Sequence, residues 1–367
     1  MYRQRLPTYS LAQEQPQDEL KYYRLNTVTY GTAPASFLAV RALHQAAMDN
    51  GADPRVINII KSDFYMDDLI TGTDTLEDAV YLKHQISDVL QRGCFPLRKW
   101  RSNEKEILGS GSIDSKDEYV LADKGSIKTL GLLWNSQSDT LHYSVNLDID
   151  DTSSKRKILS TIAKIFDPLG LVSPVTIRAK LIMQYLWQYQ IDWDEELPDP
   201  IRSSWQEFHA QLSALNNIKI ARQVIIRDVT EIQLHGFCDA SERAYGACVY
   251  IRSTDTYGNH CSNLLCAKSR VAPLKKTSLP RLELCGAVLL SRLVRKVCEN
   301  FRVTFGKRRF WCDSTIALAW IRTESVNWKT FVANRKSGGR STGIFSTRGV
   351  ETYTFCFKPG RYCIKGG

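Results

Sequence analysis

The sequence predicts an α+β protein made of several domains. Helical and extended patterns alternate over residues 26–149, a helix-rich stretch with many Trp and Tyr residues follows at 150–217, and strands around one long helix return at 218–335. The chain has 367 residues, of which 43% are hydrophobic, so it is long enough for two or three domains with their own cores. Residues 1–25 are expected to be poorly ordered. Residues 336–367, which contain 7 of the 21 glycines, are expected to form an irregular tail.

The charge balance favours a nucleic-acid partner. The net charge is +10 and the pI is about 9.0, with much of the excess in four basic segments, 96–105, 153–157, 268–276 and 292–309. A single basic segment is most often a solvated helix face or loop. Four of them beside clustered acids favour binding to phosphate backbones, where Lys and Arg release counterions.

The composition also limits location and covalent partners. No stretch reaches the roughly 18 to 20 apolar residues of a membrane span, and the first 20 residues lack the apolar core of a signal peptide. We therefore expect no membrane partner and an intracellular location, either cytoplasmic or nuclear. The ten cysteines include no CxxC pair, which favours reduced thiols and no disulfide-linked partner.

Residues 56–72 place two adjacent acids, Asp67 and Asp68, where two predicted extended runs meet. Adjacent carboxylates repel each other, and a divalent cation removes that cost. Mg²⁺ prefers carboxylate oxygens together with substrate phosphates, so this pair suits two-metal phosphoryl transfer. A solvated Asp-Asp turn is the commoner explanation of such a dipeptide, but here apolar runs flank it on both sides.

One helix is predicted before this pair, and a second helix and a hairpin are predicted after it. Residues 36–47 carry Phe37, Val40, Leu43 and Ala47 at helical spacing. A second helix is expected to begin with Asp74 as N-cap and Glu77 as its N3 partner, and to end near Gly93. Residues 127–145 are expected to form a hairpin with a polar turn.

Several of these motifs resemble the reverse transcriptase of BEL/Pao-class LTR retrotransposons, in the same order along the chain. The "YMDD" at residues 65–68 resembles motif C, and residues 23–47 resemble the strand, turn and helix of motif B. Residues 93–103 resemble the strand and basic turn after the palm helix, and residues 130–135 resemble the primer grip. Residues 155–188 resemble the stretch that follows the polymerase in Pao polyproteins. The resemblance implies a partial palm at 26–149 and a helical Pao or connection region at 150–217. It also implies nucleotide or nucleic-acid contacts from Gly31, Tyr65, Lys99 and Arg101.

The family has a third metal-binding Asp in motif A, just ahead of a segment that reads like "MYRQ", where this sequence begins. We therefore expect an incomplete palm in which Asp67 and Asp68 hold Mg²⁺ or Mn²⁺ weakly. The expected consequence is inefficient polymerisation.

A second set of acids lies in the last structured region. Asp239 is expected at the end of a strand, Glu283 in the first turn of the helix that starts near Pro280, and Asp313 at the end of an apolar strand. Each alone has an ordinary explanation as a capping or surface carboxylate, and the helix dipole alone could explain Glu283. Together and in this order they favour convergence on a metal at one end of a sheet.

The order strand-Asp, helix-Glu, strand-Asp resembles the RNase H fold, the module expected after a reverse transcriptase in such a polyprotein. The resemblance implies catalytic and metal-binding roles for Asp239, Glu283 and Asp313, and an RNA–DNA hybrid or template–primer as partner. Lys275 and Lys276 are candidate hybrid contacts. A fourth acid is expected beyond 327–335, but only Glu351 follows, so this site is also expected to be incomplete and the residues after Arg335 to derive from a frameshift or missplicing.

Two alternatives accompany this interpretation. An aspartic peptidase needs a D-[ST]-G loop, and the sequence contains none. A folded but inert nucleic-acid-binding remnant of a retrotransposon stays open, because both it and the enzyme bind duplexes. Metal-dependent activity distinguishes the two.

Overall fold

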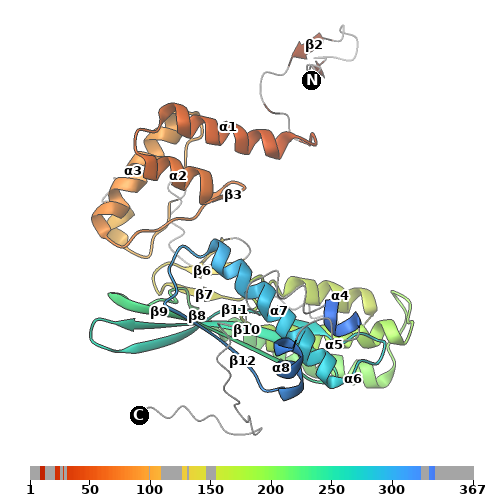
Figure 1. Ribbon diagram of the computed structural model, residues 1–367. Helices are drawn as coiled ribbons and strands as arrows, with labels where there is room; N and C mark the ends of the chain where they lie inside the picture. Colours follow the sequence, from red (N-terminus) through yellow and green to blue (C-terminus); the bar gives the residue numbers. More distant parts are fainter. Residues whose placement is uncertain are drawn as a thin grey trace. The chain divides into compact units, whose positions relative to one another are not determined.

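The computed structural model describes residues 28, 31–98, 100–108, 132–145, 154–323 and 330–334, and the backbone of 9–12, 21–24 and 126–129. The chain divides into two compact units (Figure 1). The first comprises residues 1–130 and 135–138, and the second residues 131–134 and 139–367. Both units mix helices and strands, so the α+β prediction is confirmed at this level.

The first unit is a small group of helices with short strands. Its elements are β1 (Tyr9–Ala12), β2 (Lys21–Arg24), α1 (Ala35–Asn50), α2 (Pro54–Ser62), β3 (Phe64–Tyr65), β4 (Asp68–Leu69), α3 (Leu76–Arg92), the 3₁₀ turn η1 (Lys105–Leu108) and β5 (Ser126–Thr129). The core lies where α1, α2 and α3 meet, around Ile60, Ile86 and Leu90. β1 and β2 pair antiparallel within residues 1–25, where no element was predicted.

The prediction of an extended run before Asp67 is wrong over residues 56–62, which belong to α2 (Pro54–Ser62). The Asp53 side chain accepts a hydrogen bond from the Arg55 N–H at 2.8 Å and caps the helix, and Pro54 fits its first turn. Val56, Ile59 and Ile60 then fall on one buried face at helical spacing. Val and Ile favour strands as well, so the apolar run alone did not decide between the two.

The two neighbouring helices are confirmed with smaller differences. In α1, Leu43 and Ala47 are buried, whereas Phe37 and Val40 are 67% and 39% exposed. The N-cap of α3 is Thr75, whose hydroxyl accepts from the Asp78 N–H at 3.2 Å, one residue later than predicted. The helix ends at Gly93 as expected.

The second unit begins with a hairpin and three helices that share one core. Its first elements are β6 (Leu132–Asn135), β7 (Thr140–His142), α4 (Lys155–Lys164), α5 (Ser173–Gln188), α6 (Asp199–Gln211), the 3₁₀ helix η2 (Leu212–Asn217) and β8 (Lys219–Ala221). The polar turn of the predicted hairpin lies between β6 and β7, and β8 returns to pair antiparallel with β7. The core of this part includes Ile158, Leu186 and Leu212.

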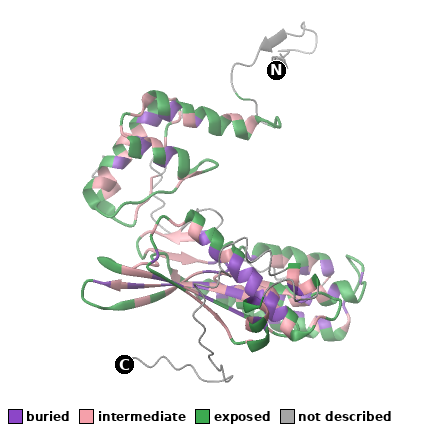
Figure 2. Ribbon diagram, in the orientation of Figure 1, coloured by how far each residue is buried: buried purple, intermediate pink, exposed green. Residues whose placement is uncertain are grey.

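The unit ends with a four-stranded sheet crossed by one long helix (Figure 1). The elements are β9 (Val229–Ala240), β10 (Ala244–Asp255), β11 (His260–Val271), α7 (Leu279–Asn300), β12 (Lys307–Cys312) and α8 (Thr315–Arg322). The strand order is β11-β10-β9-β12, with β9 to β11 antiparallel and β12 parallel to β9. The buried stripe of α7 packs on β9 and β10 (Figure 2).

A loop between α4 and α5 joins the helices to the edge of this sheet. Asp167 shapes the loop: its carboxylate accepts from the Tyr143 hydroxyl at 2.8 Å and from the N–H groups of Leu171 and Val172. The Leu169 carbonyl then accepts from the N–H of Ala267 on β11 at 2.8 Å. This hydrogen bond joins the loop to the edge strand of the sheet within the second unit.

Some predictions fall outside the described residues. These are the predicted tail at 336–367, Glu351, Lys99 and most of residues 1–25. In the part of the chain that the structure describes, no helix is both long enough and apolar enough to cross a membrane.

Candidate metal centre

The sheet topology brings Asp239 and Asp313 to the same end of the sheet. β9 and β12 run parallel with Cys238 paired to Cys312, so the residues that follow, Asp239 and Asp313, leave neighbouring strands side by side. Parallel strands end at the same edge, which is why acids far apart in the sequence meet here.

Glu283 reaches the same point from α7. It lies in the second turn of the helix, not in the first turn as predicted, because the helix begins at Leu279. Gly286, one turn later, allows the approach: a Cβ there would lie 3.3 Å from the Asp239 carbonyl oxygen and 3.5 Å from that of Gly246. The Glu283 side chain is only 6% exposed, so a surface or capping role does not explain it.

The charges of Asp239 and Asp313 act on the buried Glu283. Burial raises the pKa of Glu283 to about 7, and the nearby charges of Asp239 and Asp313 raise it further. Burial also raises the pKa of Asp239, to which the Asp313 charge contributes. Glu283 Oε2 is buried and has no hydrogen-bond partner among the described residues. A buried carboxylate oxygen without a donor is costly unless a cation or a proton joins it.

Cys312 belongs to the same group, and the sequence reasoning missed it. The Cys312 sulfur, a Glu283 carboxylate oxygen and an Asp313 carboxylate oxygen all lie within 4.8 Å of one another. A hydrogen bond from the Cys238 thiol lowers the pKa of Cys312, against the effect of its burial. The signal was the Cys directly before Asp313 at the strand end, which was interpreted only as a small core residue.

These residues fit a divalent metal ion. The group within 4.8 Å offers carboxylate oxygens of Glu283 and Asp313 and the Cys312 sulfur, whereas Asp239 is not part of it and acts on Glu283 through its charge. The buried Glu283 Oε2 has no hydrogen-bond partner among the described residues. Hard cations such as Mg²⁺ and Mn²⁺ favour carboxylate oxygens. Glu283 and Asp313 would hold the ion, and a ligand role for Asp239 stays a prediction.

Residues 154–314 match the family model of the Pao retrotransposon-like RNaseH-like domain. These residues form a Pao RNase H-like domain. The match runs from α4 through β12, so it includes both the helices and the sheet with its acids. The predicted relation to Pao retrotransposons is confirmed for this part of the chain, which is called the Pao domain below.

Solved structures show more distant likeness. A foamy viral protease-reverse transcriptase bound to double-stranded DNA is 12% identical with a TM-score of 0.42, over 89% of this chain and 50% of that chain. A second foamy viral structure is 14% identical with a TM-score of 0.20, over 90% and 60%. RNase H1 from the archaeon Halobacterium salinarum is 10% identical with a TM-score of 0.20, over 32% and 82%.

The chain thus spans 50% to 60% of the length of the foamy viral chains that it resembles. No curated protein sequence matches it.

Two lysines follow the strand end that lies beside the acidic end of the Pao domain's sheet. Asp239 pairs with Gly246, which pairs with Ser269, so the last residues of β11 lie at the same end as the acids. Lys275 and Lys276 follow in the exposed loop that leads to α7. This places both predicted hybrid contacts on the side of the sheet where the metal centre lies.

A second basic group lies where α5 meets β11. The Lys180 ammonium donates to the Ser269 carbonyl at 3.4 Å. Partial burial lowers the pKa of Lys180, as do the charges of Lys268 and Arg270, while Asp167 opposes them. Like charges held this close favour an anionic partner such as a phosphate backbone.

The sheet face that carries Asp239 and Asp313 also carries a row of rings. His235 and Phe237 precede Asp239 on alternate positions of β9, and Trp311 precedes Asp313 in the same way on β12. The Trp311 ring stacks on Phe237 at 6.0 Å and on His235 at 6.4 Å between centroids. The rings fix the spacing of the two strands next to the acids.

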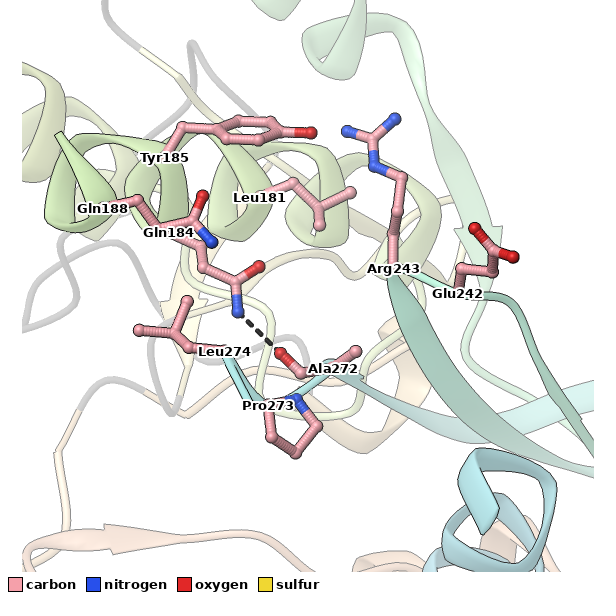
Figure 3. Close-up of a pocket in the computed structure, with 9 residues that line it drawn as sticks. All are labelled: Leu181, Gln184, Tyr185, Gln188, Glu242, Arg243, Ala272, Pro273 and Leu274. Atoms are coloured by element: carbon pink, nitrogen blue, oxygen red, sulfur yellow. Dashed lines mark hydrogen bonds between the residues drawn. The ribbon is translucent and has the colours of Figure 1, made fainter. Parts of the chain in front are cut away.

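The structure places a small pocket at the seam between α5 and the sheet (Figure 3). Tyr185 lies under the Arg243 guanidinium at 5.7 Å, and the Gln184 side chain donates to the Ala272 carbonyl at 2.6 Å. None of the predicted site acids lines it. The pocket therefore belongs to the packing of helices on sheet.

The other predicted acids lie in the first unit, on a hairpin. β3 pairs antiparallel with β4, and Tyr65, Met66, Asp67 and Asp68 are all exposed around its turn. Met66 adopts a positive φ of 58° to close the turn. No third His, Cys, Asp or Glu of the described residues joins Asp67 and Asp68 in a metal-sized group.

The remaining predicted contacts in the first unit are scattered. Gly31 lies at an exposed turn with a φ of 79°, which suits glycine. Arg101 is partly buried after α3, and the neighbouring Lys99 is outside the described residues. A nucleotide-binding role for Gly31, Tyr65, Lys99 and Arg101 stays a prediction.

Proposed function

We propose that the Pao domain is a metal-dependent module that binds an RNA–DNA hybrid at the acidic end of its sheet and hydrolyses the RNA strand slowly. The observation that carries this proposal is the buried Glu283 carboxylate between Asp239 and Asp313, with one oxygen lacking a donor among the described residues. Perturbed acids of this kind gather at catalytic sites more often than in ordinary packing.

Each group has a role in this proposal. Asp239, Glu283 and Asp313 hold Mg²⁺ or Mn²⁺, which when bound supplies activation of water and charge stabilisation for phosphodiester hydrolysis. Lys275 and Lys276 contact phosphates and set the register of the duplex. The surroundings of Glu283 keep water away from it, so without a cation it takes up a proton near pH 7.

Hybrid binding without hydrolysis is the second candidate. It is favoured because three acids converge in the part of the chain that the structure describes, whereas a fourth is expected from the RNase H resemblance. A centre with fewer carboxylates holds its cation less firmly, and hydrolysis suffers before duplex binding does.

The exposed hairpin supports a separate proposal for the first unit. Asp67 and Asp68 would contribute part of a polymerase metal site, with Gly31, Tyr65, Lys99 and Arg101 near the template–primer. The support is their position together at a hairpin tip, where both carboxylates reach solvent.

The test of the main proposal uses the full chain with a labelled RNA–DNA hybrid. We expect binding that weakens steeply with salt, and RNA cleavage that needs Mn²⁺ or Mg²⁺. Asp239→Asn should reduce cleavage by about 100-fold or more while hybrid binding is kept or slightly tightened, because a negative charge facing phosphate is removed.

Asp228→Asn is the matched control, since Asp228 is exposed at the opposite end of β9. The double variant Lys275→Ala, Lys276→Ala should lose about two phosphate contacts. The slope of log K against log salt concentration should therefore become smaller by about 2. Binding with no cleavage at any metal concentration would select the second candidate. Absence of salt-sensitive binding would refute both.

A further inference from the structure

The candidate metal centre of the Pao domain has a sulfur atom close to its carboxylate oxygens. Cys312 is the last residue of β12, and its sulfur lies within 4.8 Å of carboxylate oxygens of Glu283 and Asp313. One Zn²⁺ with bonds of about 2.3 Å to sulfur and 2.1 Å to oxygen holds its ligand atoms roughly 3.5 Å apart. Small side-chain rotations would bring the three atoms to that separation.

A second observation points to a cation at the same place. Glu283 is nine-tenths buried, being 6% exposed, and its Oε2 has no hydrogen-bond partner in the described part of the chain. Among the described residues this oxygen has no donor, so a cation or a proton would satisfy it. Cys312 is the one thiol in the group, and the other two members are carboxylates.

The type of ligand decides which cations the site prefers. Carboxylates alone suit hard cations such as Mg²⁺, whereas a thiolate favours softer ones such as Zn²⁺, Co²⁺ and Cd²⁺. We propose, on the basis of the metal centre proposed above, that Glu283, Cys312 and Asp313 form a mixed sulfur and oxygen site for a thiophilic divalent cation of the zinc class. The Cys312 thiol gives its proton to solvent as the metal–sulfur bond forms.

The neighbouring thiol has a different role. Cys238 pairs with Cys312 across the two parallel strands, and its sulfur lies 3.6 Å from the Trp311 carbonyl oxygen. Its single thiol proton is donated either to that oxygen or to the Cys312 sulfur, not to both at once. Cys238 is buried, being 7% exposed. The site thus has one sulfur ligand, and a thiophilic cation there competes with Mg²⁺ for Glu283 and Asp313.

The experiment is a titration of the reduced full chain with Co²⁺, followed by absorbance. We expect a near-ultraviolet sulfur-to-cobalt charge-transfer band that saturates at one equivalent. Cys312→Ser should remove the band and weaken Co²⁺ binding at least about tenfold. Cys261→Ser is the control, because Cys261 lies near the start of β11, at the far end of the sheet, and should leave the band unchanged.

A second measurement needs no variant. Alkylation of Cys312 by iodoacetamide, read by peptide mass mapping, should slow in the presence of Zn²⁺ but not of Mg²⁺. A band that survives Cys312→Ser, Co²⁺ binding without a charge-transfer band, or equal alkylation with and without Zn²⁺ would overturn the sulfur ligand. In those cases Mn²⁺-dependent hybrid binding and cleavage would still support the proposed function, whereas loss of all divalent-cation effects would defeat both.

Discussion

The two sets of carboxylates in this chain are built in different ways. Asp67 and Asp68 are neighbours in sequence and lie exposed on a hairpin whose strands have two residues each. Asp239, Glu283 and Asp313 come from two strands and a helix, and the middle one is buried. The first pair is brought together by the chain itself, and the second set only by the complete fold.

This difference decides how strongly each set of acids supports metal binding. Adjacent exposed acids cost little in water, so their closeness alone says nothing about a cation. Acids distant in sequence that converge around a buried carboxylate cost stability, and a protein keeps such a cost where a ligand or a reaction uses it. The Pao domain therefore carries the stronger evidence for metal binding.

The largest effect is expected from Glu283→Gln without metal. The pKa of Glu283 is about 7 in the fold against 4.5 in the unfolded chain. Between these two pH values the folded state keeps a proton that the unfolded state has lost, so the free energy of unfolding falls as the pH rises. The total loss reaches roughly 3 kcal/mol by pH 8. Below pH 4.5 both states are protonated and the effect vanishes.

Glu283→Gln cannot ionise and should escape this loss. Its unfolding free energy should therefore exceed that of the wild type at pH 8 but be similar at pH 4.5. Urea denaturation at both pH values measures it, with Asp228→Asn as the surface control. If the pH dependence of the two chains were the same, Glu283 would be an ordinary solvated acid.

The next effect concerns the support of the sheet. Gly170 has a φ of 74°, and a Cβ there would lie 1.9 Å from the Ala267 carbonyl oxygen. Gly258 has a φ of 83° with open space around it. Gly258→Ala should cost about 1 kcal/mol from backbone strain alone, and Gly170→Ala about 2 kcal/mol or more because the loop must also leave β11. Thermal unfolding of both variants compares them, and equal losses would show that the loop does not support the sheet.

The smallest effect is expected at the hairpin of the first unit. Met66 holds a positive φ of 58°, so Met66→Gly should stabilise this unit by roughly 0.5 kcal/mol, because relief of the backbone strain exceeds the added chain entropy. Asp67→Asn should change stability by less than about 0.5 kcal/mol, because the carboxylate is exposed. Hydrogen exchange of α2 and α3 reports on this unit separately. A large loss from Asp67→Asn would mean that the pair has a structural partner.

Local patterns in the sequence predicted much of the fold. The helices of 150–217 follow from apolar spacing with Pro-containing breaks, and the placement of Asp239 and Asp313 follows from acids at the ends of apolar strands. Residues 56–62 were predicted wrongly because Val and Ile fit both strand and helix, and the deciding Asp53 cap was not considered.

Contacts between distant segments could not be predicted in this way. The role of Cys312 depends on the register of β12 with β9 and on the depth of α7, which Gly286 sets. Likewise, nothing near Leu169 in the sequence indicates that its carbonyl reaches Ala267. Such contacts need the tertiary structure because local pattern carries no information on which surfaces meet.

The contact between Leu169 and β11 has a consequence for self-association. β11 is an outer strand of its sheet, and the Ala267 N–H and the Ser269 and Ala272 carbonyls are occupied by Leu169, Lys180 and Gln184. A fragment starting at residue 218 would present these groups bare, as a template on which another copy could add its own strand. Cutting the chain there would therefore favour aggregation. A fragment starting before α4 would keep the Leu169, Lys180 and Gln184 contacts that cover the edge of β11.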